Sequence, residues 1–222
     1  MIKVSELIAF SISVISLVFG YISLHKEKMP RYFQQYVCAV GCYMLEELWV
    51  IVNSLLGNGA ENGLVTVRLF GFFGCLCFML SANAHEFDKL VDEGTALRKK
   101  IPALLAPAEL LALFAVYVIM PAEGKTVFRV MCAFICLSPA LVASYFSLKH
   151  LLLPNDAMGY LEAIRGIDIL ALVFYTANFA YSIAYECFSN IIMGIYDIFL
   201  AVILLAIVIQ CRKGARKWNT LI

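Results

Sequence analysis

The chain has 222 residues, of which 63% are hydrophobic and 15% are charged, and its formal net charge is +1. Its mean hydropathy is +0.87. Soluble globular domains are about 45–50% apolar and about 25% charged, so this composition excludes that class. The apolar residues fall in stretches of about 20, which is the length that a helix needs to cross a bilayer. Barrel strands would instead alternate over about 10 residues. We therefore predict an all-α membrane protein.

Seven apolar spans follow one another along the chain, and we predict a single seven-helix transmembrane domain over residues 1–222. The connections are short, and those at 57–63 and 121–125 carry the glycine and proline residues typical of turns. The longest connection, 85–100, is also the most charged. The predicted spans are 4–24, 33–56, 64–84, 101–120, 126–148, 160–187 and 191–210.

Lysine and arginine are divided unevenly between the two sides of these spans. One side holds twelve of them, whereas the other has only Lys3 and Lys125 clearly outside the spans. Cytoplasmic loops carry the excess of basic residues, so we expect an external N-terminus and a cytoplasmic C-terminus in the plasma (inner) membrane. The twelve residues are Lys26, Lys28, Arg31, Lys89, Arg98, Lys99, Lys100, Lys149, Arg212, Lys213, Arg216 and Lys217.

The basic loop before the fourth span and the basic tail form the expected contact surface for anionic lipid or for a cytoplasmic partner protein. We expect no nucleic-acid partner. The residues assigned to this surface are Lys89, Arg98, Lys99, Lys100, Arg212, Lys213, Arg216 and Lys217.

A short internal repeat is present. The segment 17–24 aligns without gaps on 141–148, and a proline follows each segment at the same offset. The match would pair the first three spans with the last three in the same orientation, with the fourth span as connector, and parallel repeats of this kind occur in transporters. Apolar helices use few residue types, so chance is the alternative. The matched residues are Leu17, Val18, Tyr21, Ser23, Leu24 and Pro30 with Leu141, Val142, Tyr145, Ser147, Leu148 and Pro154.

Ionisable residues inside the spans are the most informative feature, because they cost free energy in lipid and usually face a bundle interior. Acids occur near the middle of the second, fourth and seventh spans and in the inner half of the sixth, and two arginines lie about one turn inside the external edge. We expect them to converge on one polar interior that opens outward. The candidate ligand- or ion-binding residues are Glu46, Glu47, Arg68, Glu109, Arg129, Asp168, Asn178 and Asp197.

Two interpretations of these charges stay open. In the first, they only pair and fix helix packing, as Arg165 could do with Asp168 at a spacing of three residues. In the second, the acids outnumber nearby bases, so that some are protonated or bind a cation. The three histidines, His25, His85 and His150, fall at the cytoplasmic ends of spans, where we expect solvated side chains rather than a metal site.

Enzymatic chemistry has no support in the sequence, and we expect no catalytic residues, metal or cofactor. Hydrolase, zinc-protease, phosphate-loop and dinucleotide motifs are absent. The last span has no lysine, which excludes a retinal Schiff base of the microbial rhodopsin type. Asp168 and Asp197 could suggest an intramembrane aspartyl protease, but the Gly-x-Gly-Asp pattern of that family is missing.

The segments 39–49, with its Glu-Glu-Leu-Trp ending, and 67–73, Val-Arg-Leu-Phe-Gly-Phe-Phe, resemble the seven-helix extracellular-sensing region of some bacterial histidine kinases and diguanylate cyclases. This resemblance implies a bacterial receptor-like sensor that binds a small molecule and drives a cytoplasmic output domain. Only twelve residues follow Gln210, so we expect signalling through a separate protein. The alternative is a small-solute or proton/cation-coupled transporter of two three-helix repeats.

Overall fold

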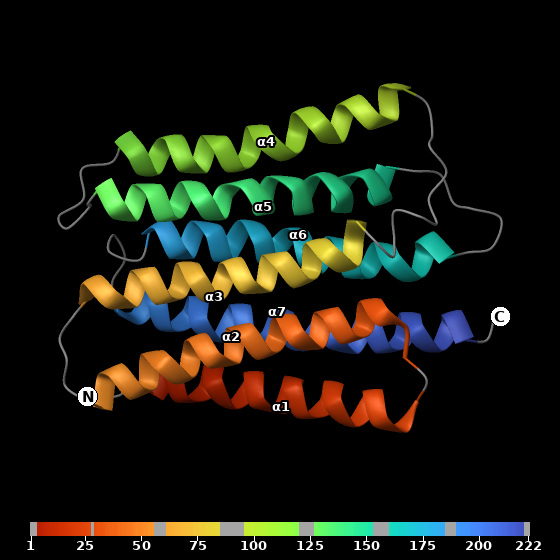
Figure 1. Ribbon diagram of the computed structural model, residues 1–222, viewed down its shortest axis with the longest axis horizontal. Helices are drawn as coiled ribbons and strands as arrows, with labels where there is room; N and C mark the ends of the chain where they lie inside the picture. Colours follow the sequence, from red (N-terminus) through yellow and green to blue (C-terminus); the bar gives the residue numbers. More distant parts are fainter. Residues whose placement is uncertain are drawn as a thin grey trace.

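The computed structural model describes residues 4–27, 29–55, 61–84, 96–119, 127–152, 160–184 and 190–219. These residues are all-helical, as predicted, and successive helices run in opposite directions along the long axis (Figure 1). The helices are α1 (Val4–Lys26), α2 (Arg31–Leu55), α3 (Glu61–Ala82), α4 (Ala96–Ile119), α5 (Val127–Leu152), α6 (Tyr160–Ala184) and α7 (Asn190–Asn219). The seventh continues beyond the predicted end at residue 210, because hydropathy marks the membrane edge and not the end of a helix.

Five of these helices are long and apolar enough to cross a membrane. They are α1, α2, most of α4, the last 20 residues of α5, and α7 up to Arg216. In α3 the apolar stretch within the described residues is Phe70–Ala82. The chain is therefore a multi-pass membrane protein, while seven crossings and their orientation stay predictions.

The helices form a ring with one helix outside it. In the ring, α1 packs on α2 and α7, α3 packs on α2 and α5, and α6 packs on α5 and α7. Two further contacts, α2 with α7 and α3 with α6, cross the interior. Helix α4 packs on α5 and, less extensively, on α6, at the edge of the molecule opposite α1 (Figure 1).

Small residues on α1 explain its close fit in the ring. Its buried positions are spaced alternately by three and four residues, so they lie on one face of the helix. Small side chains at such positions let helix backbones approach closely in a membrane, where apolar contact alone gives little association. Ser13 donates a hydrogen bond to the carbonyl of Ala9 at 2.9 Å, which satisfies a hydroxyl that faces protein rather than water. The buried positions are Glu6, Ala9, Ser13, Ser16, Gly20 and Ser23.

Gly20 lies at a close approach of α1 to α2. A methyl group added there would lie 2.7 Å from Cγ2 of Val37, whereas one added at Gly41 would meet only Leu17, at 3.8 Å. We expect Gly20→Ala to lower the free energy of unfolding by about 1–3 kcal/mol through overpacking. Gly41→Ala should be neutral or stabilising by up to about 1 kcal/mol, because alanine favours a helix. Unfolding in mild detergent, followed by circular dichroism, measures both, and equal behaviour of the two variants would contradict this packing.

Candidate functional site

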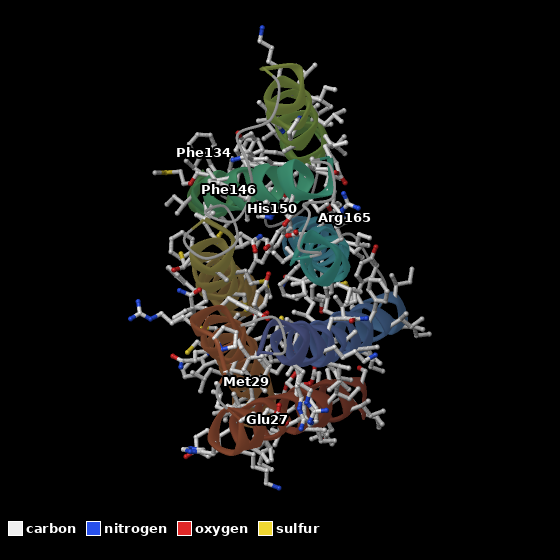
Figure 2. The ribbon with its side chains drawn as sticks, turned by 90° about the vertical axis from the view of Figure 1, so that its right-hand side faces the viewer. Glu27, Met29, Phe134, Phe146, His150 and Arg165 are labelled. Carbon is white, nitrogen blue, oxygen red and sulfur yellow. The ribbon has the colours of Figure 1, made fainter. Side chains whose placement is uncertain are left out.

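A histidine and an aspartate form a fully buried pair in the interior of the ring. Nδ1 of His150, from the end of α5, lies 3.1 Å from Oδ2 of Asp168 on α6. Both side chains are 0% exposed. Figure 2 shows His150 on the side of α5 that faces the other ring helices. An isolated ionisable group is costly in such surroundings, so each of these side chains depends on the other.

A chain of hydrogen bonds extends this pair to two more helices. Ser147 lies one turn before His150, and its hydroxyl accepts a hydrogen bond from Nδ2 of Asn83 at 3.0 Å. Oδ1 of Asn83, just after the end of α3, accepts a hydrogen bond from the Tyr36 hydroxyl of α2 at 3.1 Å. These side chains are buried. We call Tyr36, Asn83, Ser147, His150 and Asp168 the buried polar network.

The network keeps unused hydrogen-bonding capacity at its centre. Oδ1 of Asp168 and the hydroxyl of Tyr175 are buried and have no hydrogen-bond partner among the residues that the structure describes. Tyr175 lies beside Ser147 and Asn83, and it is two helical turns from Asp168. Because Ser147 accepts from Asn83, its own proton is free to turn toward either of these oxygens. The arrangement can therefore take up a proton or reorient its hydroxyl groups without losing every contact.

Asp197 forms a second buried centre. The hydroxyl of Tyr181 on α6 donates a hydrogen bond to Oδ1 of Asp197 on α7. The hydroxyl of Tyr43 on α2 donates to the backbone carbonyl of the same residue at 3.3 Å. The ring of Tyr181 stacks on that of Tyr196, with centroids 5.6 Å apart and planes at 10°. This centre joins α2, α6 and α7.

The candidate residues from the sequence lie at several helix contacts. Glu46 and Glu47 are buried on α2, and Glu46 packs directly against Gly71 of α3. Asn178 is buried on α6, whereas Glu109 is exposed on α4, outside the ring. The side chains of Arg68 and Arg129 lie outside the described residues. Asp168 and Asp197 are thus placed in separate centres.

His150 corrects an expectation. A solvated side chain was predicted for it, and this prediction is wrong, because helix α5 continues to Leu152 and turns this residue into the ring. The sequence signal was the spacing of Ser147 and His150 on one helical face, which points both side chains the same way. In the described part of the chain, no group of three or more His, Cys, Asp or Glu residues is placed to hold a metal ion.

At the end of the bundle predicted to be cytoplasmic, Glu27 joins α1 to α7. Its carboxylate accepts hydrogen bonds from Nη2 of Arg212 at 2.8 Å and from Nε of Arg216 at 3.0 Å. The guanidinium of Arg212 also lies 4.9 Å above the ring of Phe19. Figure 2 views this end of the molecule and labels Glu27. Two of the predicted surface residues are therefore occupied in an intramolecular contact.

The structure describes the side chains of two other residues of the predicted basic surface. Lys100 and Lys213 are exposed, as a lipid- or partner-contacting residue requires. Lys89 and the side chains of Arg98, Lys99 and Lys217 lie outside the described residues.

In comparisons with protein-family models, with curated proteins and with solved structures, no match to this chain was found. The resemblance to a sensing region therefore stays a prediction, and any functional conclusion depends on the geometry above.

The contact of Glu27 with two arginines predicts a pH dependence. Hydrogen bonds from Arg216 and Arg212 lower the pKa of Glu27 from 4.5 to about 2. Its contribution to stability is therefore complete above pH 4.5 and is lost as the pH falls through about 2. Because about a quarter of the Glu27 side chain (24%) is exposed, water and salt screen the contact, so its contribution is small and should weaken in high salt.

At neutral pH, we expect the melting temperature of the wild type to be slightly higher than that of Glu27→Gln. The difference in melting temperature should disappear as the pH falls from 4.5 to about 2. Melting temperatures of the two proteins in the same detergent, measured across this range, test the prediction. A gap that stays constant with pH would show that Glu27 acts through packing and not through its charge.

Proposed function

We propose that this chain is a proton-linked membrane transporter built from two parallel halves, α1–α3 and α5–α7, with α4 as the connector. The observation that carries the proposal is the pattern of helix contacts. These contacts are symmetric when α1 is exchanged with α5, α2 with α6 and α3 with α7. The exchange turns the α1–α2 contact into the α5–α6 contact, and the α2–α3 contact into the α6–α7 contact. It also converts α1–α7 into α3–α5, and α2–α7 into α3–α6. Each of these contacts is present.

The sequence repeat agrees with this exchange. The segment 17–24 of α1 aligns with 141–148 of α5, and these are the two helices that the exchange brings onto each other. Ser23 and Ser147, which match in the alignment, are both buried near the ends of their helices. In small transporters, parallel repeats provide two similar units that rock against each other around a site near the middle of the membrane.

The buried polar network supports a role in coupling because it crosses the boundary between the halves. Tyr36 and Asn83 belong to the first half, while Ser147, His150 and Asp168 belong to the second. Any rocking of one half against the other changes the distance between Asn83 and Ser147. A proton taken up by the His150–Asp168 pair changes which of these groups donate and accept, and so favours one arrangement of the halves over the other.

Proton movement in reconstituted vesicles tests the proposal. The protein is reconstituted into proteoliposomes that contain a trapped pH-sensitive dye. A gradient of sodium, potassium, a neutral amino acid or tetraphenylphosphonium is then imposed across the membrane. We expect at least one of these gradients to drive protons across it. Asp168→Asn and His150→Gln should abolish this movement, because neither variant keeps an ionisable pair. His25→Gln is the matched control, since His25 is an exposed histidine at the corresponding end of α1.

Two results would contradict the proposal. One is that, under every gradient, vesicles with the wild type, vesicles with Asp168→Asn and vesicles without protein show the same proton movement. The other is equal loss in His25→Gln, which would indicate a general defect. Gel-filtration profiles of all variants show whether each one is folded.

A second candidate, the receptor-like sensor that signals through a separate protein, is favoured by the end of α7. This helix has 30 residues, and its last turns are tied to the end of α1 by Glu27, Arg212 and Arg216. A ligand that shifts the ring would therefore move the end of α7, where an output protein could bind.

Co-purification distinguishes the two candidates. If the sensor role is correct, mild-detergent extraction from native membranes should recover a stoichiometric partner that carries a kinase, cyclase or transcription-factor domain. Glu27→Gln should weaken that association, and Gly41→Ala serves as a control away from this contact. Recovery of the chain alone would count against the sensor.

A further inference from the structure

A groove of about 420 Å³ opens on the outer surface where α4 meets the ring. Its walls come from four helices, and apolar side chains such as Leu113, Leu148 and Ala180 make up most of them. The exceptions are Glu109 of α4, Thr176 of α6 and Tyr196 of α7. This volume lies within the range of about 300–1,000 Å³ that is typical of small-molecule sites. Because α4 lies outside the ring, the groove faces the bilayer.

The carboxylate of Glu109 is the unusual element of this groove. It has no hydrogen-bond or ion-pair partner among the residues that the structure describes. A carboxylate at this depth of a membrane is costly and is normally paired or functional. Its surroundings are apolar, so a partner that complements both features is a cation with an apolar body.

We propose that the groove binds a lipophilic monovalent cation, which enters from the bilayer. The Glu109 carboxylate neutralises the positive charge, and the walls from α5 and α6 contact the apolar body. The Tyr196 ring adds the attraction of its π face for a cation. This assignment rests on the transporter proposal for what happens after binding, because it names the substrate class.

The groove connects to the buried centres through single contacts. Tyr196 stacks on Tyr181, and the Tyr181 hydroxyl binds the Asp197 carboxylate in the interior of the ring. Leu148, in the groove wall, directly follows Ser147 of the buried polar network. A cation seated against Tyr196 is therefore one residue away from the Asp197 centre.

Binding of tetraphenylphosphonium to the purified full chain in detergent tests the inference. We expect saturable binding that weakens about tenfold or more in Glu109→Gln, which loses the charge at an apolar site. Glu109→Asp should restore part of the affinity. Tyr196→Leu should weaken binding about threefold, whereas Tyr196→Phe, which keeps the ring, should not. Glu27→Gln is the matched control, because it removes a carboxylate far from the groove.

Other occupants give different results. If neutral triphenylphosphine oxide binds as tightly as the cation, or if Glu109→Gln binds as tightly as the wild type, the groove is an acyl-chain site and the inference is wrong. Should Glu109→Gln fail to fold, Glu109→Asp and the two Tyr196 variants still decide the outcome. Cation binding without proton movement in vesicles overturns the transporter proposal alone. Proton movement driven by another gradient, without cation binding, overturns this inference alone.

Discussion

The structure depends on one constraint, which is that a bilayer interior has no water to hydrate a polar group. Every ionisable or hydroxyl side chain within a span must find a partner in the protein or remain at a cost in free energy. The described residues meet this constraint by facing large apolar side chains such as Ile15, Phe134 and Ile195 outward and polar ones into the ring. The serines of α1 bind their own backbone, and His150 binds Asp168. Polar satisfaction therefore decides which helices must be neighbours.

The same constraint separates a structural role for the buried pair from a functional one. A pair that served packing alone would be expected to use all of its hydrogen-bonding capacity, because each unmet buried oxygen lowers stability. Asp168 instead keeps Oδ1 without a partner among the described residues, and so does the hydroxyl of Tyr175, two helical turns away on α6. The hydrogen bonds that reach this point come from both halves of the ring. Unused capacity at the boundary between the two proposed halves supports the proton-dependent switch that we propose.

The sequence predicted the helices well, but it did not predict which buried side chains meet, and both results have a physical reason. Long apolar stretches predict a helix from local composition, so the seven described helices fall close to the predicted spans. Burial inside a bundle depends instead on which helices become neighbours. The sequence offered Arg165 of the same helix as one possible partner of Asp168, and nothing in it indicated the contact with His150 of α5. Asn83 gave no signal of its own, because its role depends on Ser147 and Tyr36, which lie on other helices.

Helix α4 follows from the topology of the proposed repeat. A unit of three crossings ends on the side of the membrane opposite to its start, so a second unit in the same orientation needs one additional crossing between them. That additional helix has no counterpart under the exchange of halves, which accounts for its place outside the ring, where its main contacts among the described residues are with α5 and α6. Its contact with α6 is much less extensive than its contact with α5, because α6 already packs against α3, α5 and α7. A groove beside α4 is the geometric result, and the only acid of that helix, Glu109, lies in its wall. The helix that breaks the symmetry of the two proposed halves thus also carries the acid of the proposed cation site.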